Sequence, residues 1–426
     1  MIGNKKIGLA LSGGGYRAAA FHLGTLKKLH KLNLLQNIDF ISTISGGSII
    51  GAYYGLHGKD FAKFEKDFKQ LLQKSIIGKI IFSLEFLVRI LLIIAIWIFS
   101  FVLFPVWVAI NIFFISLILI GIFFFKIFPT TKLVSKAYKK LFYKDFKLNS
   151  IPKSPGIVMN STNLDTGTLL SFTSEKVFDS TYKYQLNKDL VFNPEKIEIA
   201  KAIAASTAVP YAFSPTYFTR NEFFDKKDYD KVKPTLVDGG LYDNQGIYRL
   251  TKMDSEYKCD IVIVSDGSYP FKKKFMNVNP LPVLGRVSNV LMNRIKNFQF
   301  IQNIYASSEE EIYEIGYFSL NWEYENCVSG FVNALAKKEI RPHLIEIQKI
   351  TDELIKDKTA LQTHLKTSIG FESIVKDGLT KDEIFEVSSI GTNLKALSDR
   401  QIELLTRHAE VLTEIQVRLY CPSLFN

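Results

Sequence analysis

Cysteine is scarce in this 426-residue sequence, and its few copies form no metal or disulfide pattern. Cys259, Cys327 and Cys421 lie far apart and are odd in number, with no CxxC or Cys/His spacing. These features exclude a disulfide framework, indicate a reducing compartment and call for neither a metal nor another cofactor. The N-terminus also lacks the apolar stretch of a signal peptide, so secretion by that route is not expected.

Two motif classes are absent as well. No G-x-x-x-x-G-K-[ST] or G-x-G-x-x-G pattern occurs, which disfavours a nucleotide-binding protein. A Ser–His–Asp triad would need a suitable histidine, but most histidines fall within predicted helices and none follows a strand in a glycine-bounded loop. The six are His22, His30, His57, His343, His364 and His408. A Ser–Asp dyad would manage without one.

The most hydrophobic part of the chain is a run of 36 residues without a charge, residues 90–125. Basic residues flank it: residues 59–89 carry a net charge of +3 and residues 126–147 a net charge of +6, out of +11 for the whole chain. Positive charge on both sides of an apolar run favours an anionic membrane surface, and not nucleic acid, as the partner. It also predicts that both ends stay on the cytoplasmic side.

As one helix this run would be roughly 54 Å long, whereas a hydrocarbon core is about 30 Å thick. Two crossings or a re-entrant hairpin fit better, with the break at Pro105, because the residue before a proline disfavours helix. Glu85 and Arg89 are spaced i, i+4 and can pair in the first helix. The alternative is a buried helix pair in a soluble protein.

Around this insertion the chain alternates apolar, β-branched strands with helices, which predicts an α/β layer fold. The predicted strands include "KIGLALS", "IDFISTI", "GIVMNST" and "CDIVIVSDG". Ser398 and Gln401 form a capping box that opens a last helix. We expect four segments: 1–75 and 131–330 as two parts of one catalytic domain, 76–130 as the inserted hairpin, and 331–426 as a helical cover of that domain.

The stretch "FISTISGGSIIGAYYG" places Ser45 between strand formers and helix formers. Gly46 and Gly47 would let a following helix pass close to the strand, as in a nucleophile elbow. The usual pattern is G-x-S-x-G, and here Thr43 stands in place of its first glycine. The N-terminus of the helix would favour a developing negative charge. Taken alone, the motif fits either a nucleophile or an ordinary loop.

A second glycine-rich stretch is "LALSGGGYRAAAFHLGTL". Gly13, Gly14 and Gly15 follow a predicted strand and expose consecutive N–H groups that can hold a phosphate or a tetrahedral oxyanion. Arg17 either adds a fixed positive charge beside this loop or is a surface helix residue that caps a neighbouring carbonyl.

A candidate acid/base group lies in "TLVDGGLYDNQGI", where Asp238 ends a short apolar strand before Gly239. The simpler interpretation is a turn aspartate, which is common before glycine. Alternatives for the acid/base role are Asp225, Asp243 and Asp266.

Together these stretches resemble the patatin-like phospholipase family. "SGGGYR" resembles its glycine-rich oxyanion loop, "ISGGS" its nucleophile elbow and "VDGG" its base motif, in the same order. "MNSTNLDTGTLLSF", "AIAASTAVPYAFSP" and the last helix are weaker matches, so the resemblance covers most of the chain except residues 76–130. It implies a three-layer α/β/α fold and hydrolysis of lipid acyl esters by a Ser–Asp dyad.

The resemblance also assigns roles to residues. Ser45 would attack the ester carbonyl, and Asp238 would accept and return the proton. Backbone N–H groups of Gly13, Gly14, Gly15 and Gly46 would hold the oxyanion. Arg17, Gly47 and Gly239 would support the site.

The hairpin lies between Ser45 and Asp238 in the sequence, and the two must share one compartment. The chain therefore crosses the membrane an even number of times or not at all. We expect a membrane-anchored hydrolase of phospholipid or lysophospholipid acyl esters, with its catalytic domain on the cytoplasmic side. The alternatives are an acyltransferase with the same dyad and a catalytically inert membrane lipid-binding scaffold. The sequence leaves the oligomeric state open, a homo-oligomer included.

Overall fold

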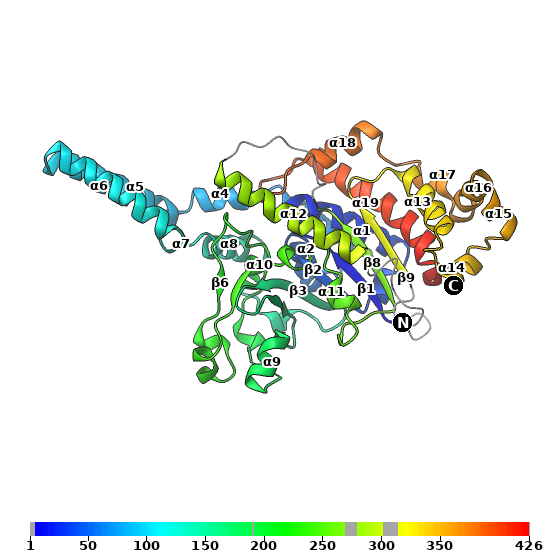
Figure 1. The fold of residues 1–426 in the computed structure, drawn as a ribbon, viewed down its shortest axis with the longest axis horizontal. Coiled ribbons are helices and arrows are strands. Elements are labelled where there is room, and N and C mark those ends of the chain that lie inside the picture. Colours follow the sequence, from blue (N-terminus) through cyan, green and yellow to red (C-terminus); the bar gives the residue numbers. More distant parts are fainter. Residues whose placement is uncertain (1–4, 190, 269–278, 301–313, 426) are drawn as a thin grey trace.

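The computed structural model describes residues 5–189, 191–268, 279–300 and 314–425. Their centre is a nine-stranded mixed sheet in the order β5-β4-β3-β2-β1-β8-β9, with β7 paired to β3 and β6 (Figure 1). The strands are β1 Ile7–Leu11, β2 Phe40–Ile44, β3 Gly156–Asn163, β4 Thr168–Phe172, β5 Val177–Phe178, β6 Thr216–Tyr217, β7 Thr235–Asp238, β8 Ile261–Asp266 and β9 Glu314–Ser319. The predicted α/β class is confirmed.

The sheet is covered on both faces, which explains why the central strands β1 and β8 are buried along their whole length and mostly apolar. In β8, Ile261 and Ile263 enter the main core, while Val262 and Val264 pack in a smaller cluster on the opposite face. The main core lies under α1 Gly15–Lys31, α2 Gly46–His57 and α19 Asp399–Tyr420. The smaller cluster includes Leu250 of α11 Tyr248–Thr251.

Two further groups of helices complete the body. Beside α2 lie α3 Phe61–Leu72 and α10 Ile199–Ser206, and α8 Thr130–Tyr138 packs against α10. The helices α9 Ser180–Leu186 and α12 Pro280–Phe300 lie elsewhere on the surface (Figure 1). The C-terminal helices are α13 Tyr324–Ala336, α14 Pro342–Ile347, α15 Asp352–Lys356, α16 Lys358–Ile369, α17 Phe371–Val375 and α18 Lys381–Ser389. The predicted capping box of Ser398 and Gln401 opens α19, which packs along α1.

The apolar insertion projects from the body as a two-helix arm (Figure 1). After α4 Ile76–Ile81, α5 Leu84–Leu103 and α6 Val106–Ile122 pack together, and Trp97 Nε1 donates to Ser116 Oγ at 2.7 Å. The break falls at Pro105, and Arg89 pairs with Glu85 at 2.8 Å, as predicted. The short helix α7 Phe124–Ile127 leads back to the body.

The arm is not a buried core pair. Only 6% of the apolar window in α5 is buried. Among the described residues, α5 is the one single helix that is long and apolar enough to cross a membrane. Residues 106–122 meet that test only together with residues 124–143, across a bend of 84°. The strands β1 and β2 precede the arm and the other seven follow it, so the arm interrupts one continuous sheet.

Candidate active site

The register of the sheet brings Ser45 and Asp238 together. The last residue of β2, Ile44, pairs with Asn160 of β3, and Ser45 follows directly. The antiparallel strand β7 pairs with the next part of β3, so that Asp238 stands opposite Ser161. Two neighbouring residues of β3 therefore hold the ends of two strands that lie almost 200 residues apart in the chain.

Ser45 occupies a sharp turn between β2 and α2. Its φ of 48° and ψ of −113° are unusual for a residue with a side chain, and such strain is typical of a nucleophile elbow. Small residues make the turn fit. A Cβ on Gly46 would lie 2.3 Å from the Gly15 carbonyl oxygen, and one on Gly47 would lie 2.2 Å from that of Leu11.

A buried hydrogen-bond chain supports the turn from behind. The Ser45 N–H donates to Ser206 Oγ at 2.9 Å, and Ser206 Oγ donates to the Asn160 carbonyl at 2.7 Å. Ser48 Oγ shares the network at 2.9 Å from Ser206 Oγ. Sequence reasoning singled out neither Ser206 nor Asn160, although Ser206 lies within "AIAASTAVPYAFSP", which resembles a family block.

Thr43 stands where the usual elbow motif has a glycine, and the surrounding structure has room for its side chain. Its Oγ1 lies 3.0 Å from Ser48 Oγ and 3.3 Å from the Val158 carbonyl oxygen, so the buried hydroxyl is satisfied. Its methyl group has room because Gly51 of α2 faces it: a Cβ there would lie 2.6 Å from Thr43 Cγ2. A glycine in α2 thus compensates for the missing glycine of the motif.

Asp238 is buried and keeps one carboxylate oxygen available. Oδ1 accepts from the Gly240 N–H at 2.8 Å, while Oδ2 has no hydrogen-bond partner among the described residues. Burial raises the pKa of Asp238 to about 6, and the hydrogen bond from the Gly240 N–H and the nearby Ser45 hydroxyl oppose this rise. The carboxylate is therefore a stronger base than an exposed aspartate.

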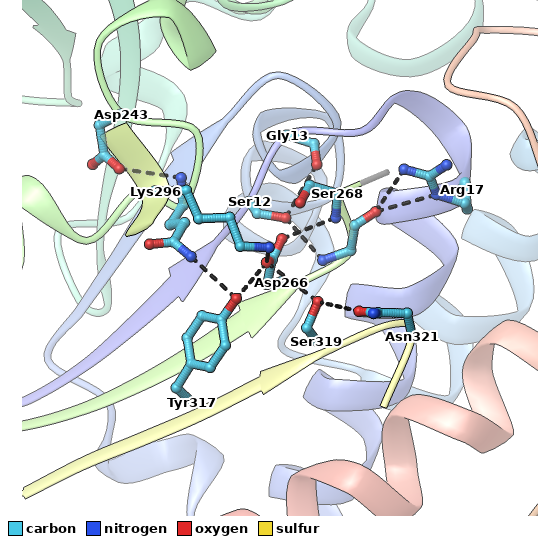
Figure 2. A network of polar contacts seen from close by, with 12 residues as sticks. Ser12, Gly13, Arg17, Asp243, Asp266, Ser268, Lys296, Tyr317, Ser319 and Asn321 are labelled. Carbon is cyan, nitrogen blue, oxygen red and sulfur yellow. Dashed lines mark hydrogen bonds and ion pairs between the residues drawn. The ribbon is translucent and has the colours of Figure 1, made fainter. Parts of the chain in front are cut away.

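The alternative aspartates are already engaged. Asp243 accepts the N–H groups of Gln245, Gly246 and Tyr248, and Asp225 caps an exposed turn. Asp266 is held by Lys296 and Tyr317, each at 2.5 Å (Figure 2). Lys296 keeps the pKa of Asp266 below its usual range, although burial opposes this effect. Of the four candidates, Asp238 alone is next to Ser45 with a free oxygen.

The glycine loop lies against the elbow, as the close approach of Gly15 to Gly46 shows. Gly14 has φ 143° and Gly15 φ 62°, conformations that favour glycine. Within the described part of the chain, the N–H groups of Gly14, Gly15 and Gly46 have no hydrogen-bond acceptor. The Gly13 N–H differs from the expectation, because it donates to the Asn244 carbonyl at 2.9 Å. Gly13 therefore anchors the loop and is not placed as an oxyanion donor.

Arg17 clamps the loop from inside the protein. It is fully buried, and its guanidinium donates to the Gly267 carbonyl at 3.0 and 3.2 Å (Figure 2). It also donates to the Ile390 carbonyl at 2.7 Å. Arg17 therefore caps carbonyl groups, as one of the two interpretations expects, but it is a buried residue and not a surface one. Next to Asp238, a Cβ on Gly239 would lie 2.5 Å from the Asn160 carbonyl oxygen, so only glycine fits there.

His22 is a supporting residue that sequence reasoning missed. Its Nε2 lies 2.9 Å from the Ser12 carbonyl oxygen and its Nδ1 2.8 Å from Ser265 Oγ. Burial lowers the pKa of His22 to about 4, so the ring is neutral at pH 7. Its position inside a predicted helix gave no signal that it reaches the loop.

A comparison with protein families finds a model described as Patatin-like phospholipase, which matches residues 9–250. No curated protein matches. Human GIVD cytosolic phospholipase A2 is similar in structure, with a TM-score of 0.50 and 15% identity over 99% of this chain and 60% of that one. The structure of its complex with methyl gamma-linolenyl fluorophosphonate and terbium chloride has a TM-score of 0.48 and 13% identity, over 99% of this chain and 59% of that one. VipD from Legionella pneumophila has a TM-score of 0.30 and 11% identity, over 97% of this chain and 91% of that one.

The chain thus spans 60% of the human protein, and that likeness concerns the fold. The family match covers more than half of this chain and includes the glycine loop, the elbow at Ser45 and the strand that ends at Asp238. The chain belongs to the patatin-like phospholipase family.

Proposed function

We propose that this protein hydrolyses the acyl esters of membrane phospholipids or lysophospholipids with a Ser45–Asp238 dyad. One observation carries the proposal: a strained serine stands beside a buried carboxyl group whose one oxygen has no partner among the described residues. This observation supports the proposal over phosphate binding or a simple turn, because both would leave the cost of the strain and of the free oxygen unexplained.

The reaction follows from the positions of the groups. Ser45 Oγ attacks the ester carbonyl carbon while its proton passes to Asp238 Oδ2. The N–H groups of Gly14, Gly15 and Gly46 stabilise the oxyanion. When the tetrahedral intermediate collapses, the lipid alcohol leaves with the proton from Asp238. Water then attacks the acyl-serine, Asp238 takes its proton, and the fatty acid is released as Ser45 regains its hydrogen.

The arm supports a membrane substrate. Its exposed surface is apolar over both α5 and α6, and an exposed apolar area of this size requires a covering phase. Both ends of the arm return to one body, which agrees with an even number of crossings. Lysines at its foot favour an anionic, cytoplasmic membrane surface.

Labelling with a fluorophosphonate probe tests the proposal on protein extracted from membranes. We expect wild-type protein to be labelled, Ser45→Ala to lose all labelling, and Asp238→Asn to be labelled far more slowly, since dyad or triad bases contribute about 10²–10⁴-fold. No labelling of folded wild type would favour an inert lipid-binding scaffold.

A second candidate reaction is acyl transfer, in which a lipid alcohol replaces water as the acceptor. The dyad would serve both. Free fatty acid as the main product from radiolabelled phospholipid supports hydrolysis, whereas a new acylated lipid without free fatty acid supports transfer.

A further inference from the structure

The segment 206–214 connects the dyad to the arm. At its start, Ser206 Oγ accepts the Ser45 N–H at 2.9 Å. Two residues later, the Ala208 carbonyl accepts the Asp238 N–H at 2.8 Å. The backbone of both members of the dyad is therefore fixed by the beginning of one short segment.

The end of the same segment is fixed to the foot of the arm. Ser214 Oγ accepts the Thr131 N–H at 3.1 Å, and the Ser214 N–H donates to Thr130 Oγ1 at 2.8 Å. Thr131 Oγ1 also donates to the Ser214 carbonyl. Thr130 and Thr131 open α8, only three residues after α7 ends the arm. A segment of nine residues, 206–214, thus connects the dyad to the foot of the arm.

Between these two attachments the segment exposes apolar side chains. Val209 is 42% exposed and Tyr211 57% exposed, and Tyr211 has φ 68°, which is rare for an aromatic residue. No charged residue occurs from 202 to 219. We call residues 209–213 the rim. An uncharged, outward-facing loop beside an apolar arm is suited to lie on the same bilayer as the arm.

We infer that the rim contacts the bilayer and passes a phospholipid to Ser45 directly from it. The inference rests on the proposed function and narrows its substrate to lipid that is still embedded in a membrane. Tyr211 and Val209 would shield the acyl chain from water as its ester moves toward the dyad, which lowers the cost of leaving the bilayer.

Two hydrolysis rates test this inference with full-length protein in phosphatidylglycerol–phosphatidylcholine vesicles. One is for a fluorogenic phospholipid in the vesicles, and the other is for water-soluble p-nitrophenyl butyrate. We expect Val209→Asp with Tyr211→Asp to lower the ratio of the first rate to the second at least about tenfold, which corresponds to about 1.4 kcal/mol. The control Tyr184→Asp, at an 86% exposed position on α9, should leave the ratio unchanged.

An unchanged ratio in the rim variant would overturn the inference. The soluble ester separates this outcome from failure of the proposed function: wild type that cleaves neither ester and takes no fluorophosphonate would refute both.

A fluorescent label gives a readout that does not need activity. The native cysteines Cys259, Cys327 and Cys421 are buried, so a thiol-reactive dye can be directed to Tyr211→Cys or to Tyr184→Cys. We expect quenchers carried on lipid acyl chains to reduce the emission of the dye at position 211 at least twofold and to leave the dye at position 184 unaffected. Equal quenching at the two positions, or none at position 211, would contradict contact between rim and bilayer.

Discussion

The ionisation of Asp238 sets the pH dependence of the proposed reaction. Its pKa of about 6 means that the carboxylate is a competent base above pH 6 and is protonated below it. We expect kcat/KM for a water-soluble ester to fall about tenfold per pH unit well below pH 6. Stopped assays between pH 4.5 and 8 would show it. A rate that stays constant down to pH 4.5 would assign the base elsewhere.

The raised pKa of Asp238 also predicts that Asp238→Asn, which removes the proposed base, increases the stability of the fold. In the unfolded chain Asp238 has its ordinary pKa of 3.8, so above pH 6 the native state bears the cost of an ionised, buried carboxylate. Asp238→Asn should therefore raise the free energy of unfolding at pH 8, by up to about 3 kcal/mol for a shift of about two pKa units. Oδ1 can still accept from Gly240.

This gain should shrink between pH 6 and pH 4 and vanish below the unfolded pKa, where both states are protonated. Thermal unfolding in detergent at pH 8 and pH 4 measures the difference. A variant with a lower melting temperature at pH 8 would show that the carboxylate stabilises the site.

At the residue scale, the sequence allowed prediction of the groups that form local motifs. Ser45 and Asp238 were identifiable because each ends a strand beside glycines. Ser206, Asn160 and His22 were not, because their roles depend on contacts between segments far apart in the chain. Gly13 was assigned wrongly as a donor for the same reason: its N–H is occupied by Asn244, which reaches it from beyond β7.

At the scale of elements, the contact between the elbow and the glycine loop depends on Gly46. A Cβ there would lie 2.3 Å from a backbone oxygen, which cannot move as a side chain could. We expect Gly46→Ala to lower the free energy of unfolding by about 1–3 kcal/mol and to slow fluorophosphonate labelling at least about tenfold.

The matched control is Gly330→Ala on α13. A Cβ at Gly330 has no atom within 4 Å, so alanine should be neutral or stabilise the helix by about 0.5–1 kcal/mol. If both substitutions had the same small effect on unfolding and labelling, close packing at Gly46 would not be what holds the elbow.

Elements were predicted well where one local signal dominates. The break at Pro105 and the capping box of α19 follow from a single residue or pair. The sequence predicts β7 only as a short apolar strand. No residue within β7 indicates that it pairs antiparallel with the part of β3 that extends beyond β2. That pairing, however, brings Ser45 and Asp238 together, so the sequence points to the two candidate residues but not to the reason why they meet.

For the whole molecule, the foot of the arm combines a cavity with positive charge. The cavity has a volume of about 600 Å³ and lies between α4, the start of α5 and α8. Its lining includes three lysines, Lys79, Lys136 and Lys140, and a single acidic residue, Glu85. Phosphate headgroups at the membrane surface would be attracted there, each lysine contributing about 1 kcal/mol.

We therefore expect the hydrolysis of vesicle phospholipid by the wild type to rise with the fraction of phosphatidylglycerol, and Lys79→Glu with Lys140→Glu to lose most of that rise. The control Lys337→Glu with Lys376→Glu makes the same change in net charge at two exposed positions directly after α13 and α17, far from the arm in the sequence. If the two double variants respond alike, net charge alone governs the response. A loss confined to the foot of the arm, and removed by high salt, would show that the arm and the lysines together select an anionic membrane for the dyad.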